Sequence, residues 1–180
     1  MKLKTIAATA LAAAVVPVAA LAQAPAPTGA DKANGARACK ALKASMGDTF
    51  AATYGTNADK SNAMGKCVSA WAKQSAAARK AAHTACKAEQ RDPNFAASHD
   101  GKTFAQVYGN RKGSAAFARC VSAKQQATTA SARKATVNAA SLCKAERKAD
   151  AAAFTAKYGT KANAFGKCVS QTAKTLQQQG

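Results

Sequence analysis

Three copies of one short pattern, each holding two cysteines, constrain this chain more than any other feature. Each copy opens with a Cys-Lys-Ala triplet, continues through Phe-x-x-x-Tyr-Gly and closes on Cys-Val-Ser. The opening cysteines are Cys39, Cys86 and Cys143, and the closing ones are Cys67, Cys120 and Cys168. A pattern that recurs in this way predicts one structural unit repeated three times.

The cysteines predict a disulfide framework, because an even number of them in an exported chain is typical of disulfide-bonded proteins. The repeat favours pairing within each unit: Cys39 with Cys67, Cys86 with Cys120, and Cys143 with Cys168. Closing loops of this length stabilises a fold by roughly 3–4 kcal/mol each. Metal binding is disfavoured, since the sequence has no Cys-x-x-Cys motif and only two histidines.

Residues 1–22 have the pattern of a secretory signal peptide. Lys2 and Lys4 precede an apolar run, and Ala20 and Ala22 supply the small residues before a cleavage site. The run is shorter and richer in alanine than a membrane-spanning helix, although a retained anchor is the alternative interpretation. We therefore expect an exported protein, either periplasmic or extracellular.

The composition of the remaining chain is unusual for a folded domain. Residues 23–180 contain only three Leu, five Val and six Phe, and no Ile. The chain has 27 Lys and Arg against 8 Asp and Glu, and without Lys2 and Lys4 there are 25 basic residues and a net charge of +17. Such a chain is normally disordered, so the disulfides and the good helix propensity of Ala, Lys, Arg and Gln must hold it together.

The spacing of apolar residues predicts helices throughout. We expect a disordered leader over residues 23–30, long helices over 63–90 and 114–148, and a short helix at each Phe-x-x-x-Tyr-Gly segment, with Gly55 as a left-handed cap. Phe95 and His99 resemble a duplicated half of that segment. The predicted N-caps are Asp31, Asp48, Asn62, Asp92, Asp150 and Asn163.

The predicted fold is all-α, with three disulfide-stapled helical repeats joined by long Ala/Lys-rich helices. The units span residues 31–74, 75–126 and 127–180. An extended zigzag and an antiparallel bundle are both compatible with this pattern, and the polar, alanine-rich middles of the long helices favour the extended form.

The unit resembles a known repeat. The run Cys-Lys-Ala-Glu, Phe-x-x-x-Tyr-Gly-Thr and Phe-Gly-Lys-Cys-Val-Ser between Cys143 and Ser170 is similar to one in uncharacterised exported bacterial proteins. The resemblance covers most of residues 37–175. It implies a secreted bacterial protein, and it implies no activity.

Catalytic chemistry has little support in this sequence. His83 and His99 are the only histidines, and their positions favour packing over catalysis. The acidic residues are scattered, and no glycine-rich phosphate loop is present. We therefore predict no catalytic residues, no metal site and no cofactor.

The positive charge is the one feature that predicts a function. Distributed lysines and arginines attract polyanions through counterion release. Possible partners are extracellular nucleic acid, acidic envelope polymers and anionic lipid headgroups. The candidate contacts are Lys66, Arg79, Lys80, Arg111, Lys112, Arg119, Arg133, Lys134 and Lys167.

The sequence thus favours a non-enzymatic, secreted or periplasmic cationic protein that binds anionic polymers or surfaces. One alternative is a structural or envelope-associated spacer, in which the charge only keeps an alanine-rich chain soluble. A secreted antimicrobial protein or toxin is less favoured, because the helices have mixed rather than strongly amphipathic faces.

Overall fold

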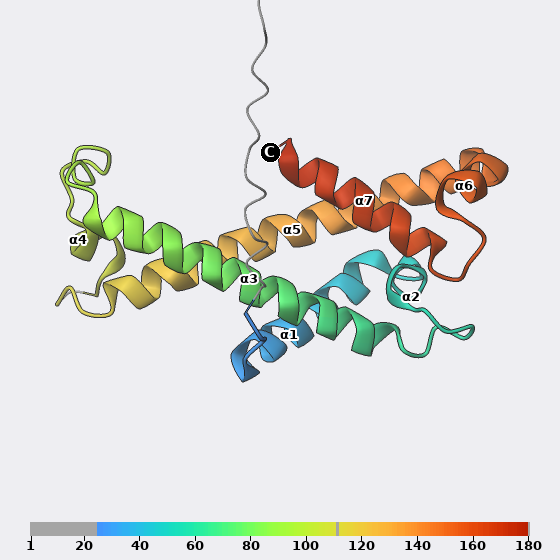
Figure 1. The fold of residues 1–180 in the computed structure, drawn as a ribbon, viewed down its shortest axis with the longest axis horizontal. Helices are drawn as coiled ribbons and strands as arrows, with labels where there is room; N and C mark the ends of the chain where they lie inside the picture. The colour runs from blue at the N-terminus through green and yellow to red at the C-terminus, as the bar shows by residue number, and fades with distance from the viewer. Residues whose placement is uncertain (1–24, 111, 180) are drawn as a thin grey trace, which may run out of the picture.

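The computed structural model describes residues 25–110 and 112–179, so the expected signal peptide and Arg111 lie outside the described residues. The described residues form seven α-helices and no strand, which confirms the all-α prediction (Figure 1). The helices are α1 (Gly29–Met46), α2 (Thr49–Tyr54), α3 (Ala63–Arg91), α4 (Phe104–Tyr108), α5 (Ala116–Ala149), α6 (Ala151–Tyr158) and α7 (Ala164–Gln178).

The three disulfides form within the units, as the repeat predicts. Cys39 is bonded to Cys67, Cys86 to Cys120, and Cys143 to Cys168, with Cα–Cα distances of 5.9, 6.0 and 6.0 Å. These bonds join α1 to α3, α3 to α5, and α5 to α7. Each of the two long helices therefore belongs to two units and carries a disulfide near each end.

The long helices α3 and α5 run in opposite directions and cross each other, with the first part of α5 against α3 (Figure 1). Helix α1 packs along the first part of α3, and α7 packs along the second part of α5. Units 1 and 3 consequently lie together at one end of the crossed pair. Unit 2, which contains α4, occupies the other end by itself (Figure 1).

Units 1 and 3 share one hydrophobic core, whose larger members are Leu42, Phe50, Trp71, Phe154, Phe165 and Val169. Unit 2 has a separate aromatic cluster, in which Phe95 stacks on His99 at 3.8 Å and meets Phe104 edge-on at 5.5 Å. The fold is thus an antiparallel bundle at one end with a projecting unit at the other. The preference for a zigzag of separate units was wrong.

The alanine-rich middles of the long helices explain this difference. Ala72, Ala76, Ala132 and Ala139 are all buried, although the sequence argument treated these segments as polar. A methyl side chain lets two helix backbones approach closely, so a face of alanines packs well without any large apolar residue. Gly35 extends this close packing, because a Cβ there would lie 2.9 Å from the Val68 carbonyl oxygen of α3.

Helix α1 begins earlier than the sequence predicts, at Gly29, inside the leader expected over residues 23–30. Thr28 is the N-cap, because its hydroxyl accepts a hydrogen bond from the Asp31 backbone N–H while the Asp31 carboxylate accepts one from the Thr28 backbone N–H. This is a capping box. Asp31 therefore belongs to the first turn rather than to the cap position predicted for it.

Of the other predicted caps, only Asp150 acts as one, accepting a hydrogen bond from the Ala153 backbone N–H at 2.8 Å. The remaining three N-cap positions, at Asp48, Asn62 and Asn163, carry no side-chain cap hydrogen bond. Asp92 ends α3, and residues 93–101 form turns in place of the predicted helix.

The glycines that follow α1 and α2 have different backbone conformations. Gly47 ends α1 with a positive φ of 53°. Gly55 has an extended backbone with φ of −72°, so the left-handed cap predicted there was wrong. The Lys60 side chain reaches over Gly55, donates to its carbonyl at 3.0 Å and also donates to the carbonyl of Ala162 in unit 3.

Candidate binding site

Units 2 and 3 each hold a hydrogen-bonded glutamate and tyrosine beside the disulfide. The Tyr108 hydroxyl donates to Glu89 at 3.0 Å, and the Tyr158 hydroxyl donates to Glu146 at 3.2 Å. Each glutamate is the last residue of a Cys-Lys-Ala-Glu segment, and each tyrosine comes from Phe-x-x-x-Tyr-Gly. The two most regular elements of the repeat therefore meet in space, which sequence reasoning missed because it assigned these glutamates no role.

A lysine completes each of these clusters. Lys124 pairs with Glu89 at 2.7 Å, and Lys157 pairs with Glu146 at 2.9 Å. Burial alone would raise the pKa of Glu89, but the hydrogen bonds from Lys124 and Tyr108 outweigh it and hold that pKa below its usual value. Burial and the bond to Glu89 raise the pKa of Tyr108. The pair therefore keeps a charged carboxylate and a protonated phenol.

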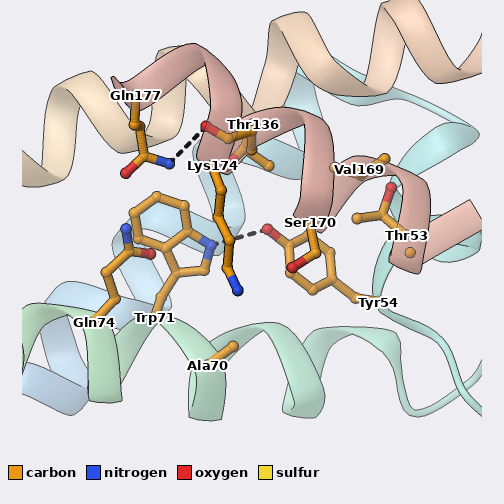
Figure 2. Close-up of a pocket in the computed structure, with 12 residues that line it drawn as sticks. Thr53, Tyr54, Ala70, Trp71, Gln74, Thr136, Val169, Ser170, Lys174 and Gln177 are labelled. Atoms are coloured by element: carbon orange, nitrogen blue, oxygen red, sulfur yellow. Dashed lines mark hydrogen bonds between the residues drawn. The ribbon is translucent and has the colours of Figure 1, made fainter. Parts of the chain in front are cut away.

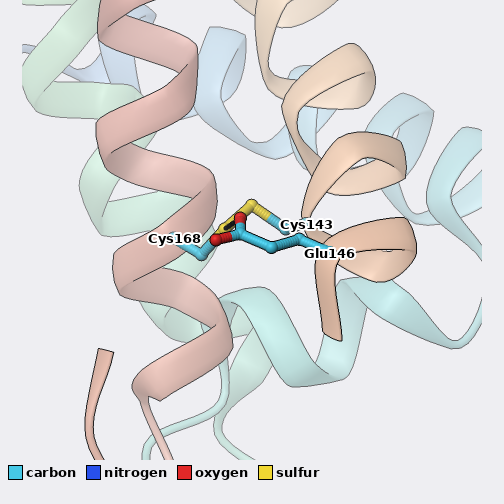
Figure 3. Close-up of side chains that lie close together, drawn as sticks. All are labelled: Cys143, Glu146 and Cys168. Carbon is cyan, nitrogen blue, oxygen red and sulfur yellow. Dashed lines mark hydrogen bonds between the residues drawn. A yellow bond between two sulfur atoms is a disulfide. The ribbon is translucent and has the colours of Figure 1, made fainter. Parts of the chain in front are cut away.

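The same region of unit 3 contains a cluster of potential metal ligands (Figure 3). One ligand atom from each of Cys143, Glu146 and Cys168 lies within 4.8 Å of the other two. The two sulfurs are bonded to each other, however, and zinc binds thiolates. In the oxidised protein this cluster is a disulfide with a neighbouring carboxylate.

Unit 1 departs from this arrangement at both partner positions. Leu42 stands where units 2 and 3 have glutamate, and Trp71 stands where unit 2 has Lys124, four residues after the second cysteine. Trp71 donates its indole N–H to the Tyr54 hydroxyl at 2.9 Å. Tyr54 is therefore an acceptor here, and its own proton is not donated to a carboxylate. Leu42 and Trp71 of unit 1 therefore replace the ion pair of Glu89 and Lys124 in unit 2.

A cavity of about 460 Å³ lies beside this pair, at the seam between units 1 and 3 (Figure 2). Tyr54 of α2 and Trp71 of α3 form one side, and Lys174 extends from α7 towards them (Figure 2). The remaining lining residues are Thr53, Ala70, Gln74, Thr136, Gly166, Val169, Ser170, Ala173 and Gln177. A volume of this size is typical of small-molecule sites.

Two further hollows adjoin the crossed helices. One of about 390 Å³ shares Ser170 and Lys174 with the first cavity and adds Lys167 to its rim. The other, of about 460 Å³, lies between α1, α3 and α5 and is lined by Arg37 and Arg133. Two of the predicted polyanion contacts, Lys167 and Arg133, thus line these hollows.

Arg79 does not belong among the free basic residues, because it pairs with Asp31. The Arg79 guanidinium donates to the Asp31 carboxylate at 3.1 Å, and Ser75 and Gln125 also donate to that carboxylate, at 3.0 and 3.4 Å. Burial would raise the pKa of Asp31, but the hydrogen bonds, the largest of them from Thr28, lower it to about 2. Arg79 is thus largely a structural residue.

The exposed face of α3 carries an ordered row of lysines, here called the α3 lysine row: Lys66, Lys73, Lys80 and Lys87. They recur every seven residues, which is close to two helical turns, so neighbours are about 10 Å apart along one face. The only acid in α3, Glu89, lies on the opposite face and pairs with Lys124. The sequence analysis named Lys66 and Lys80 but missed the row, which its heptad period could have revealed.

The other predicted contacts are spread over the surface. Lys112, Arg119 and Lys134 are exposed, but Lys112 precedes α5 while Arg119 and Lys134 lie fifteen residues apart on it, which is about 22 Å. Arg111 lies outside the described residues. Basic residues are therefore present on α1, α3, α5 and α7, and the α3 lysine row is distinguished by its regular seven-residue spacing.

No protein-family profile, curated protein or solved structure matches this chain. Over residues 25–110 and 112–179, no helix has the length and apolarity needed to cross a bilayer. Three disulfides are typical of proteins that fold in an oxidising compartment.

Proposed function

We propose that this chain is a non-enzymatic, exported protein that binds anionic polymers or surfaces through the α3 lysine row. The supporting observation is the row itself, four exposed lysines on a rigid helix with no acid on the same face. The two disulfides on α3, at Cys67 and Cys86, fix this helix against α1 and α5. The lysines therefore keep their spacing without a large entropic cost on binding.

The spacing suits a long, uniformly charged partner. Neighbouring lysines about 10 Å apart lie at about the screening length of physiological salt, so each one acts nearly independently on the phosphate, carboxylate or sulfate nearest to it. Affinity then comes from counterion release and depends little on sequence. The aromatic rings are packed in the cores, which disfavours stacking on nucleic-acid bases.

A charge-matched pair of variants tests this proposal. The row variant replaces Lys66, Lys73, Lys80 and Lys87 with Gln. The control variant replaces four exposed lysines elsewhere with Gln: Lys43, Lys144, Lys148 and Lys161. Both variants have the same net charge, so solubility and long-range attraction change equally.

Binding is measured against double-stranded DNA, a polyuronate and anionic vesicles over a range of salt concentrations. The row variant should lose most of its affinity, and its slope of log K against log salt for DNA should flatten by about 3 to 4, since each contact adds about 0.9. The control variant should keep nearly the wild-type slope. Equal losses in both variants, or no binding by the wild type at low salt, would contradict the proposal and favour a spacer whose charge serves solubility.

A further inference from the structure

The cavity beside Tyr54 and Trp71 exists where unit 1 differs from the other two units. In units 2 and 3 the tyrosine proton is used internally, by Glu89 and Glu146. In unit 1 the carboxylate is replaced by Leu42, and Tyr54 accepts from Trp71 instead. The Tyr54 O–H is therefore a donor without a carboxylate partner, at the wall of a cavity of about 460 Å³.

Other donors converge on the same space. Lys174 and Ser170 project from α7 into the cavity opposite Tyr54 (Figure 2). None of the three ion pairs among the described residues involves Lys174. Burial raises the pKa of Tyr54 despite the Trp71 hydrogen bond, so the phenol remains a donor at neutral pH. An ammonium and two hydroxyls that line one cavity are a donor set suited to an oxyanion.

We propose that this cavity binds one carboxylate-bearing sugar unit of an acidic polysaccharide, held by Lys174, Tyr54 and Ser170. The carboxylate accepts from these three groups. The amides of Gln74 and Gln177, which line the same cavity, face the ring hydroxyls. This assignment rests on the proposed function, because it takes the anionic polymer of that proposal to be a polyuronate. The adjoining hollow with Lys167 on its rim offers the next carboxylate of such a chain a second cation.

The lining of the cavity argues for a sugar over a purely apolar acid. Ser170 contributes a hydroxyl and the two glutamines contribute amides, while Tyr54 and Trp71 contribute apolar ring surface. The Thr53 and Thr136 hydroxyls donate to the backbone of their own helices and offer a ligand acceptor oxygens. A sugar ring has apolar C–H faces and polar hydroxyl edges, which this mixture matches. Gly166 lets α7 approach α2 closely at the edge of the cavity, because a Cβ at that position would collide with the Thr53 carbonyl oxygen of α2.

Trp71 is the only tryptophan in the chain. It lines this cavity and also the hollow between α1, α3 and α5, so its fluorescence reports binding in either space and the variants below distinguish the two. The experiment titrates a short oligogalacturonate into the oxidised full-length protein, with a neutral oligosaccharide of equal length as comparison. We expect saturable binding of the acidic oligomer only. Absence of saturation with the acidic oligomer, or equal binding of the neutral one, would overturn the proposal.

Three variants locate the binding, measured by calorimetry because removal of the Tyr54 hydroxyl alters the Trp71 signal itself. Lys174→Gln should weaken binding about tenfold, and Tyr54→Phe several-fold. Tyr158→Phe is the matched control, since it removes the same hydroxyl from unit 3, where the proton is used by Glu146. Circular dichroism confirms that each variant folds. A Tyr158→Phe variant as impaired as Tyr54→Phe would overturn the assignment.

The α3 row variant separates this inference from the proposed function. It should bind the short oligogalacturonate as the wild type does, while losing affinity for long polymers. If the short oligomer binds and the row variant also keeps its polymer affinity, the row proposal fails and the cavity stands. If polymers bind through the row but no short oligomer enters the cavity, the cavity proposal fails alone.

Discussion

The Asp31 carboxylate accepts a hydrogen bond from Arg79 at 3.1 Å, although the Asp31 side chain is only 1% exposed. Asp31 lies in the first turn of α1, Arg79 in α3, and Gln125 of α5 donates to the same carboxylate and to Ser75. Three helices from units 1 and 2 thus meet at one buried charge. This contact fixes where α1 docks on the crossed pair.

Replacing Asp31 with Ala should therefore destabilise the fold by about 2–3 kcal/mol. The change removes the capping box and leaves the donors of Arg79 and Ser75 without their acceptor, and uncompensated buried donors are costly. Urea unfolding of the oxidised protein measures the loss. Asp48→Ala is the control, because Asp48 is exposed and makes no cap hydrogen bond, so it should change stability by less than about 0.5 kcal/mol.

The same carboxylate makes stability depend on pH in acid. The pKa of Asp31 is about 2 in the folded protein against 3.8 ordinarily, so its contribution is complete above pH 3.8 and is lost as pH falls towards 2. The difference corresponds to about 2 kcal/mol. Asp31→Asn should therefore be less stable than wild type at pH 6 by at least this amount, and the gap should shrink near pH 2. A constant gap would contradict the prediction.

Two glycines at equivalent places in the repeat should respond oppositely to alanine. A Cβ at Gly166 would collide with the backbone carbonyl of Thr53, so Gly166→Ala should cost about 1–3 kcal/mol. A Cβ at Gly65 meets nothing within 4 Å, so Gly65→Ala should stabilise α3 by about 0.5 kcal/mol. Unit 2 already has alanine here, at Ala118. Thermal unfolding of both variants decides the matter, and a similar effect in both would show that the close approach of α2 and α7 is not rigid.

Loss of the unit 2 disulfide should unfold only one end of the molecule. Replacing Cys86 and Cys120 with Ser removes about 3–4 kcal/mol of loop constraint from a unit outside the core that units 1 and 3 share. Hydrogen exchange should accelerate in residues 84–121 and remain slow around Trp71 and Val169.

The matching replacement of Cys143 and Cys168 provides the contrast. This disulfide belongs to the shared core, so exchange should accelerate throughout units 1 and 3. Identical exchange patterns in the two double variants would contradict the prediction, because they would show that unit 2 does not unfold separately from the core of units 1 and 3.

The covalent framework and most helix bounds follow from the sequence. The repeat was enough to pair all six cysteines, and the four-residue spacing of Phe154 and Tyr158 predicted their contact, seen at 4.7 Å between ring centroids. His99 packs against Phe95, as its place in the half-motif suggested. These features are local, so neighbouring residues determine them.

Features that depend on distant residues were not predictable in this way. Asp31 is a residue type that favours the N-cap position, but Thr28, three residues earlier, occupies that position. The burial of Ala76 and Ala139 depends on which helices cross, and alanine itself favours neither burial nor exposure strongly. The cavity at Tyr54 was missed because Leu42 and Trp71 were not compared with the residues at the same positions of the other units. Their difference matters only because Glu89 and Glu146 bind tyrosines there.

The order in which the disulfides join the helices has one further consequence. Cys39–Cys67, Cys86–Cys120 and Cys143–Cys168 connect α1, α3, α5 and α7 in series, without using the intervening loops. A protease that cuts within 56–61, 93–102 or 159–162 therefore releases no fragment containing a long helix. The nicked protein should keep its mass and shape until a reductant is present.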